Sequence, residues 1–220
     1  MRRAVRLLLL VVVTILPWFL KKPISKFLFG WKIGIGSRIG LSWIDACEVR
    51  IGAGVKIGHF NIVRCCNILD ICDGVTIING NQFFGSTFVT SGWENSLEIG
   101  EATYITSGHF VDLSGGVHIG INSVIGGRGS QIWSHSIRQV GSVRKLVPFS
   151  VSIGRDTYIG AGAILVCGSI PEDCLVGAGA VVSKSFPETG HIQVLAGNPA
   201  IVRKSYPKNF PLDSSDTFLN

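Results

Sequence analysis

Residues 49–58 read VRIGAGVKIG, in which Ile51 and Ile57 are six positions apart and a glycine directly follows each isoleucine. The same spacing continues on both sides of this stretch and is interrupted only at Asp45. The aliphatic residues of this first tract are Ile33, Ile39, Ile51, Ile57, Val63, Leu69 and Val75. Two further tracts repeat the spacing with small shifts, through Ile99, Ile105, Val111, Val117, Ile119 and Ile125, and through Ile153, Ile159, Leu165, Ile170, Val176 and Val182.

A six-residue period fits neither an amphipathic helix, which repeats every ~3.6 residues, nor an ordinary alternating strand. It fits a parallel solenoid of triangular coils, in which each group of six residues supplies one short strand and one corner. The aliphatic side chain then points inward, and glycine permits a turn that a Cβ would obstruct. The repeats run from about Ile33 to Val182, so most of the chain is predicted to form one all-β solenoid.

These repeats resemble those of the hexapeptide-repeat acyltransferases. The resemblance implies a left-handed parallel β-helix, and the handedness rests on the resemblance alone, because parallel crossovers are in general right-handed. Another parallel solenoid is the alternative. Two segments leave the six-residue period, residues 79–96 and residues 130–150. We expect both to be excursions from the coils, which is where solenoids commonly carry their function.

The chain has 220 residues, enough for one domain with a substantial core. We expect the β-helix to occupy residues 31–204, after an N-terminal segment of residues 1–30 and before a polar, loosely packed tail of residues 205–220. The net charge is +6, but eight of the 20 basic residues precede Asp45, the first acidic residue, which leaves 12 against 14 acidic residues. Positive charge confined to the N-terminus suits an anionic membrane surface better than a nucleic acid.

Residues 7–20 read LLLLVVVTILPWFL and have basic residues on both sides. Fourteen residues are marginal for a spanning helix, and Pro17 is expected to bend or end the helix. A signal peptide is a rival interpretation, but no small-residue cleavage motif follows Leu20. The sequence favours an apolar helix through which residues 1–26 associate with a membrane surface. A helix that caps the open end of the β-helix is the alternative.

Transfer of an acetyl group to an alcohol requires a base for the hydroxyl proton and a donor for the oxyanion. Histidine suits the role of base because its pKa lies near neutrality. Of the five histidines, only His135 lies in the second excursion, and seventeen residues separate it from Ile153. This arrangement is similar to that of maltose, galactoside and polysaccharide-assembly acetyltransferases, and the resemblance implies that His135 is the catalytic base. A lone loop histidine is otherwise an ordinary surface residue.

The resemblance also implies a binding site for acetyl-CoA as co-substrate, with no metal. The backbone N–H of Ala161, which follows Ile159-Gly160, corresponds to the donor for the thioester or oxyanion, and Ala178 with Gly179 corresponds to a contact with the pantetheine chain. The family's basic and closing positions correspond to Lys184, to Gly197, Asn198 and Pro199 within AGNPA, and to Arg203 and Lys204. Simple packing at the corners, and solvated basic side chains, are the alternatives for these positions.

Contacts with the acceptor are predicted at His109, Asp112 and Trp133. The family carries an asparagine near Gly108 or His109, whereas this chain reads TSGHFVD. His109 and Asp112 are candidates for binding sugar hydroxyls, and His109 is also a candidate for sharing the proton transfer. Trp133 is a candidate for stacking on a sugar ring. Outward solvated side chains, and packing of Trp133 beneath the loop, are the alternatives.

Together these features predict an O-acetyltransferase that moves acetyl from acetyl-CoA to a sugar hydroxyl of a surface polysaccharide or its lipid-linked precursor. The resemblance further implies a homotrimer with an active site at each subunit junction, and the basic N-terminus predicts a peripheral position on the inner face of the cytoplasmic membrane. The alternatives are a non-catalytic β-helix scaffold and a zinc enzyme similar to the γ-class carbonic anhydrases. The zinc enzyme would require His109, His118 and His135 to converge.

Overall fold

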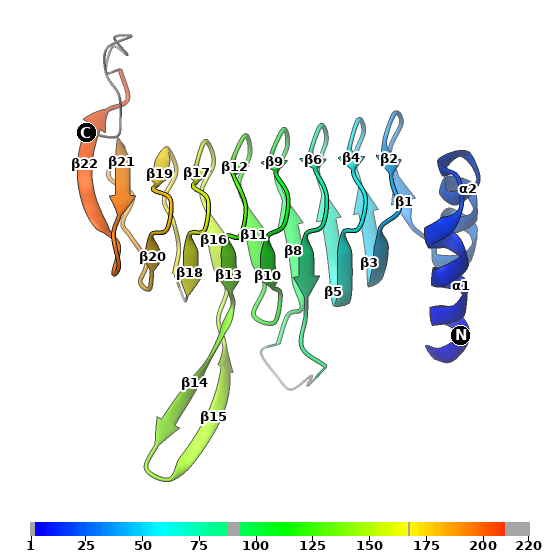
Figure 1. Ribbon diagram of the computed structural model, residues 1–220, viewed down its shortest axis with the longest axis horizontal. Coiled ribbons are helices and arrows are strands. Elements are labelled where there is room, and N and C mark those ends of the chain that lie inside the picture. The colour runs from blue at the N-terminus through cyan, green and yellow to red at the C-terminus, as the bar shows by residue number, and fades with distance from the viewer. Residues whose placement is uncertain (1–2, 88–92, 167, 210–220) are drawn as a thin grey trace.

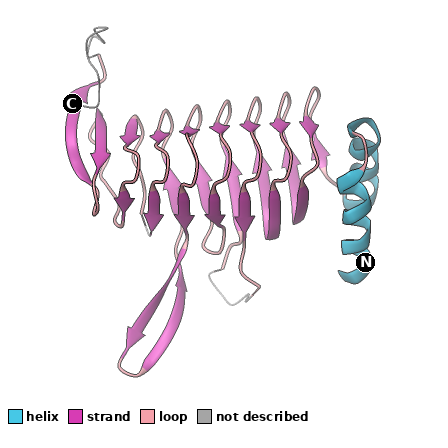
Figure 2. Ribbon diagram, in the orientation of Figure 1, coloured by secondary structure: helices cyan, strands magenta, loops and turns pink. Residues whose placement is uncertain are grey.

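The computed structural model describes residues 3–87, 93–166 and 168–209, which form a pair of helices followed by a triangular prism of stacked coils (Figure 1). Each coil up to the one that ends at β18 contributes a strand to each of three faces, and strands of successive coils pair in parallel. The helices lie at one end of the prism and the described C-terminal strands lie at the other (Figure 2). The predicted solenoid of parallel strands is confirmed.

The first and third faces belong to one eleven-stranded sheet, because the two longest strands, β3 (Trp43–Ile51) and β5 (Ile62–Ile71), continue around the corner between them. The other strands of the first face are β1 (Lys32–Ile33), β8 (Ser96–Ile99), β11 (Val117–Ile119) and β16 (Val151–Ile153). The other strands of the third face are β7 (Gln82–Phe84), β10 (Phe110–Asp112), β13 (Gln131–Trp133), β18 (Ile164–Val166) and β20 (Val181–Val182).

The second face is a nine-stranded sheet. Eight of its strands run in parallel and come from successive coils: β2 (Arg38–Ile39), β4 (Lys56–Ile57), β6 (Thr76–Ile77), β9 (Tyr104–Ile105), β12 (Val124–Ile125), β17 (Tyr158–Ile159), β19 (Cys174–Val176) and β21 (His191–Ala196). The last strand, β22 (Ile201–Pro207), folds back antiparallel to β21. Residues 205–207 of the predicted tail therefore belong to a strand, and residues 210–220 lie outside the described residues.

The aliphatic positions of the six-residue period form the core, and every one of them is buried. On the second face they stack in register, as Ile105, Ile125 and Ile159 do in three successive coils. The interruption at Asp45 has a local cause, because β3 shifts its register between Ile44 and Ala46 and Ile44 takes the inward position. The period was therefore a correct prediction of which side chains point inward.

The two excursions begin later than the sequence predicted. Phe83, within residues 79–96, is buried and pairs in register with Val111, and Ile132, within residues 130–150, is buried between the same coil and the next. An aromatic residue in the inward position concealed the first strand, and an extra residue at the preceding corner displaced the second. Among the described residues, the chain leaves the coils over residues 85–87 and 93–95, in the first excursion, and over residues 134–150, in the second. The second of these excursions is a hairpin of β14 (His135–Val140) and β15 (Val143–Pro148).

The N-terminal segment folds as two helices, α1 (Arg3–Ile15) and α2 (Trp18–Phe29), separated at Pro17 as its restricted backbone predicts. Leu10 joins the core of the β-helix, and Leu7, Trp18 and Phe29 pack against it. The segment therefore caps the open end of the prism. No helix among the described residues is long and apolar enough to cross a membrane.

Three basic side chains of the helices each bind a backbone carbonyl group, one at each of the three corners of the first coil. Lys22 Nζ donates to Gly34 O at 2.7 Å, Lys21 Nζ to Gly40 O at 2.5 Å and Arg6 Nη2 to Ala46 O at 2.5 Å. Burial lowers the pKa of Lys21 to about 8. Part of the N-terminal positive charge thus serves to close the β-helix, a role that the sequence did not reveal.

We expect Arg6→Ala to destabilise the protein by about 1.5–3 kcal/mol, because it removes a charged hydrogen bond and leaves the carboxylate of Asp45 without its partner. Arg6 Nε lies 3.2 Å from Asp45 Oδ1 in a partly buried pair. The measurement is the denaturant midpoint of unfolding. Arg50→Ala is the control, because Arg50 makes ion pairs on an exposed surface, where such pairs contribute little. Equal midpoints for the two variants would contradict the capping role.

Candidate active site

The two excursions leave the prism at the same corner, between its third and first faces (Figure 1). The first follows β7 and the second follows β13, two coils further along. His135 is the first residue of β14, at the base of the second excursion. Its side chain is about a third exposed, so the predicted base is accessible from solvent.

His135 is held by a buried carboxylate. Its Nδ1 lies 2.7 Å from Asp112 Oδ2, and the carboxylate side chain is only 5% exposed. The same Asp112 oxygen accepts the backbone N–H of Ser134 at 2.8 Å, and Asp112 Oδ1 accepts the hydroxyl of Ser114 at 2.5 Å. Because the carboxylate accepts hydrogen bonds, we assign the Nδ1–H tautomer to His135, which leaves the Nε2 lone pair free.

Asp112, the predicted ligand of a sugar hydroxyl, is bonded to groups of the protein itself. Both of its carboxylate oxygens are occupied by protein donors, and the residue is buried at the end of β10. On the third face, Asp112 pairs with Phe84 of the preceding coil. Its position allows it to orient His135 and to stabilise the positive charge that the imidazole gains on accepting a proton.

Aromatic rings surround this pair. Trp133 stacks on Phe110 with ring centroids 4.8 Å apart and lies 6.3 Å from the His135 ring. The ring centroid of Trp93, from the first excursion, lies 5.9 Å from that of His135. The predicted Trp133 is therefore beside the base, and packing against Phe110 accounts for part of its role. Trp93 was missed, because only the fold brings the two excursions together.

His109, a predicted acceptor contact and a candidate for sharing the proton transfer, lies at a different corner of the prism from the His135–Asp112 pair. Its ring is buried in a polar ladder inside the corner between the second and third faces. Nδ1 accepts the backbone N–H of Ser130 at 3.2 Å and Nε2 lies 2.8 Å from Thr106 Oγ1. Burial lowers the pKa of His109 to about 4, so the imidazole is neutral near pH 7 and both of its nitrogens are occupied.

The three histidines of the zinc-enzyme alternative bind different partners. His109 belongs to the ladder just described, His118 lies 3.2 Å from Glu98 on the first face, and His135 binds Asp112. Within the described ranges, no three metal-binding side chains gather in one place. The imidazoles therefore do not form the converging set that the zinc-enzyme alternative requires.

The predicted donor residues line the corner between the second and third faces. Gly160, Ala161, Gly162 and Ala163 form a turn in which Ala163 N donates to Gly160 O at 3.3 Å, and Gly162 has a φ of +66°. This is the pattern of a type II turn with Ala161 at its second position. A Cβ on Gly160 would lie 2.6 Å from Ala178 N of the next coil, which explains the requirement for glycine there.

The next coil repeats the arrangement. Ala180 N donates to Gly177 O at 3.2 Å, and Gly179 has a φ of +68°, so Ala178 occupies the second position of a matching turn. Ala161 and Ala178 are thus equivalent residues in adjacent coils, about 4.8 Å apart along the prism. Among the described residues, neither backbone N–H has an acceptor.

Earlier coils satisfy the equivalent N–H groups with side chains. The N–H of Leu41 donates to His59 Nδ1 at 3.1 Å, that of His59 to Asn79 Oδ1 at 2.7 Å, and that of Asn79 to Ser107 Oγ at 3.3 Å. In the last coils the described residues supply no such acceptor. The residue beside Ala161 is Ala178, which has only a methyl group, and the residue beside Ala178 is Gly197, which has no side chain. The change from polar to small residues leaves the adjacent N–H groups of Ala161 and Ala178 available to a ligand, and the equivalent N–H groups of Ser107 and Gly127 likewise have no acceptor among the described residues.

A groove of about 630 Å³ lies beside these donors on the second face. Gly160, Ala161 and Ala178 line it together with the apolar side chains of Leu175 and Val194. An apolar groove with two backbone donors at its edge fits an extended chain that carries carbonyl oxygens. The four small residues of the predicted donor site, Gly160, Ala161, Ala178 and Gly179, therefore lie on one edge of the prism.

The other predicted cofactor residues are more dispersed. Gly197, Asn198 and Pro199 form the turn between β21 and β22, and Gly197 O accepts the N–H of Val181 at 2.9 Å, which closes the last coil. Arg203 and Lys204 follow on β22 at the same end of the prism. Lys184 lies at the other corner, after β20, where its Nζ is 5.4 Å from the ring centroid of Phe186. The structure does not bring Lys184 to the groove.

His135 and Ala161 lie on different edges of one prism. His135 follows β13, at the corner between the third and first faces, whereas Ala161 precedes β18, at the corner between the second and third faces. The third face separates them within a single chain. A site that uses both therefore requires two copies of the chain.

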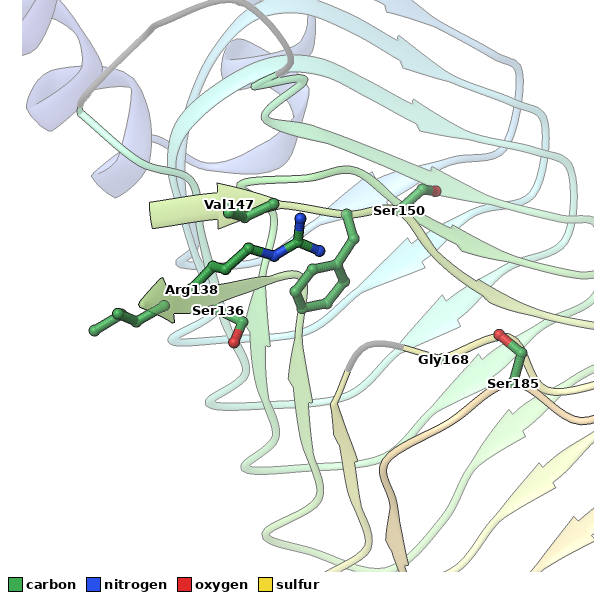
Figure 3. Close-up of a pocket in the computed structure, with 8 residues that line it drawn as sticks. Ser136, Arg138, Val147, Ser150, Gly168 and Ser185 are labelled. Atoms are coloured by element: carbon green, nitrogen blue, oxygen red, sulfur yellow. The ribbon is translucent and has the colours of Figure 1, made fainter. Parts of the chain in front are cut away.

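A cavity of about 450 Å³ lies between the β14–β15 hairpin and the later coils. Ser136 and Arg138 line it from the hairpin, and Ser185 lies across the gap from them (Figure 3). Ile137, between Ser136 and Arg138, also lines the cavity, whereas His135 and Asp112 are not among its lining residues. This cavity is therefore adjacent to the His135–Asp112 pair and separate from it.

No family model matches the chain. Among solved structures, the polysialic acid-specific acetyltransferase NeuO is 18% identical with a TM-score of 0.51, over 84% of this chain and 85% of that one. The polysialic acid O-acetyltransferase OatWY is 18% identical with a TM-score of 0.50, over 85% and 88%. The hexapeptide-repeat-containing acetyltransferase VCA0836 from Vibrio cholerae is 17% identical with a TM-score of 0.50, over 92% and 89%.

At these identities the likeness establishes the fold. The protein is a left-handed parallel β-helix with N-terminal helices. It is built on the hexapeptide-repeat architecture of these acetyltransferases, as the repeat around VRIGAGVKIG predicted.

Proposed function

We propose that the protein is an acyl-CoA-dependent O-acetyltransferase that acetylates a sugar hydroxyl of a surface polysaccharide or its lipid-linked precursor. The observation that carries the proposal is the His135–Asp112 pair, with a free Nε2 at the base of a solvent-accessible excursion. The polysialic acid acetyltransferases NeuO and OatWY have the same fold, which supports a glycan acceptor and acetyl as the acyl group.

The residues suit a direct transfer. His135 Nε2 removes the proton of the sugar hydroxyl as its oxygen attacks the thioester carbon, and Asp112 stabilises the imidazolium through Nδ1. The N–H of Ala161 donates to the oxyanion and the N–H of Ala178 donates to a carbonyl of the pantetheine chain. The imidazolium then returns the proton to the departing thiolate. Acetyl-CoA supplies the activated acetyl group, and the groove beside Ala161 fits its extended arm.

We also propose a homotrimer, with His135 of one chain facing Ala161 of its neighbour. The separation of these residues on different edges of one prism supports this arrangement, because a closed ring of three prisms places one edge of each beside another edge of the next. Trp93 and Trp133 beside His135 suit the apolar face of a sugar ring. Lys184, Arg203 and Lys204 are proposed contacts of the CoA phosphates.

The test is release of CoA from acetyl-CoA by the purified protein in the presence of candidate glycans, with mass spectrometry of the glycan product. We expect transfer of one acetyl group per CoA released, and no release without an acceptor. A panel that includes neutral and acidic polysaccharides and shows no acetylated product with any of them would contradict the proposal. A scaffold protein with the same fold gives that negative result.

We expect Asp112→Asn to lower kcat about 10- to 100-fold, because it removes a charged hydrogen bond worth about 1.5–3 kcal/mol from the base. The KM for acetyl-CoA stays near its wild-type value, since Asp112 contacts His135 and no part of the groove. Steady-state kinetics separate the two parameters. A large rise in KM at unchanged kcat would assign Asp112 to binding and contradict its role as a positioning residue.

A further inference from the structure

The helical pair presents an apolar surface on the side that faces away from the prism. Along α1 the inward positions are occupied by Leu10 and Val13, and the outward positions carry exposed Val5, Leu8 and Ile15. Leu8 and Ile15 keep 69% and 68% of their surface exposed. Such a density of exposed aliphatic side chains is unusual on a soluble protein and marks an interaction surface.

Helix α2 continues the same surface. Its inward positions are Lys21 and Ser25, both buried, while Phe19 and Phe27 are 74% and 89% exposed. These two phenylalanines and the outward residues of α1 form what we call the outer face: Val5, Leu8, Val11, Val12, Ile15, Phe19 and Phe27.

The charge around the outer face is positive. The chain has no acidic residue before Asp45, and Asp45 is paired with Arg6 on the inner side of the helices. Lys26 is exposed on α2, and Arg3 and Lys32, at the two ends of the helical pair, are exposed as well. An apolar centre with a basic border, on helices of 13 and 12 residues that are too short to span a bilayer, fits a helix pair that lies in the headgroup region of an anionic membrane.

We propose that the outer face docks on the surface of an anionic lipid bilayer and holds the β-helix upright on it. The inner side of the helices is occupied by the first coil, through Leu10 and the bonds of Arg6, Lys21 and Lys22 to three corners. The helices lie across the end of the stack of coils, roughly perpendicular to its long axis (Figure 1). A membrane in contact with the outer face is therefore perpendicular to the prism axis.

This orientation sets the height of the candidate active site. On the third face, β3, β5, β7, β10 and β13 are successive strands, so His135 lies four strand spacings, or about 19 Å, beyond the first coil. The helix layer adds about 10 Å, and roughly 5–10 Å of that layer is immersed. The assignment of an acceptor rests on the proposed function. The acceptor is then a lipid-linked saccharide whose reacting hydroxyl stands roughly 20 Å above the headgroups.

Flotation with lipid vesicles tests the dock directly. We expect the wild-type protein to float with vesicles of phosphatidylcholine and phosphatidylglycerol in equal parts, and more weakly with phosphatidylcholine alone. Leu8→Glu combined with Phe19→Glu should lower the partition coefficient about 100-fold or more, since each lost apolar side chain accounts for about 10-fold or more. Ile121→Glu, at an equally apolar but distant exposed position, is the matched control and should float as the wild type does.

The alternative occupant of the outer face is a second copy of the chain, placed end to end. Sedimentation without lipid distinguishes the two: a doubling of the mass that the Leu8 and Phe19 substitutions abolish, together with no flotation, would overturn the proposal. The His135→Ala protein should float normally. If all variants float as expected but none transfers acetyl, the dock stands and the proposed function fails.

The height of the site is tested with acceptors of different length. With the enzyme on vesicles, a lipid-linked saccharide of several sugars should react at least about tenfold faster than its single-sugar counterpart, because only the longer one reaches His135. The same saccharides released from lipid should react at similar rates in solution. Equal rates on the vesicle for both acceptors would overturn the upright orientation.

Discussion

His135→Ala should lower kcat/KM for acetyl transfer about 10²- to 10⁴-fold, which is the usual cost of removing a general base. Among the described residues, no other group can replace Nε2 of His135, because His109 is buried with both nitrogens bound and Asp112 is covered by its own hydrogen bonds. Without the imidazole, the sugar hydroxyl must lose its proton to water. Steady-state rates of acetylated glycan formation measure the effect.

His191→Ala is the matched control, because His191 is an exposed residue on β21 whose imidazole bonds, among the described residues, to the neighbouring Thr189. It should keep wild-type kinetics. Binding of acetyl-CoA to the His135→Ala protein should also be unchanged, since His135 lies on a different edge from the groove of Ala161. Unchanged turnover in His135→Ala would remove His135 from the mechanism.

The sequence predicted the coils well because each coil is a local structure. An inward aliphatic residue and a corner glycine lie within six residues of each other, and their spacing already encodes the turn, as at Ile159 and Gly160. The same rule failed at Phe83, whose inward position depends on Val63 and Val111 of the neighbouring coils rather than on its own type. Boundaries of the excursions were misjudged for that reason.

The candidate site was predicted only in part because its contacts are distant in the chain. Asp112 was predicted as a sugar ligand, and its contact with His135, 23 residues later in the chain, had no signal in the sequence. Trp93 carried no signal, since nothing near it in the sequence indicates that the first excursion approaches the second. Likewise, Arg6 and Lys21 were predicted to bind a membrane surface as part of the basic N-terminus. In the structure they donate to backbone carbonyl groups of the first coil, which has no preceding coil to supply hydrogen-bond donors.

Ala161→Pro should lower kcat about 10²- to 10³-fold, the usual cost of losing one oxyanion donor. Proline removes the N–H and is otherwise suited to the second position of a type II turn, where Ala161 lies between Gly160 and Gly162. The fold should therefore survive, and the unfolding midpoint of the variant checks this. Ala161→Ser, which retains the N–H, is the control and should keep most of the activity.

Mixing the two inactive proteins tests whether one site draws on two chains. In trimers reassembled from equal amounts of His135→Ala and Ala161→Pro chains, three quarters of the trimers are mixed, and each mixed trimer contains one junction with an intact His135 and an intact Ala161. About one quarter of wild-type activity should return if the sites lie at subunit junctions. If His135 and Ala161 of the same chain worked together, neither parent nor mixture would recover any activity, because every chain then carries one defect.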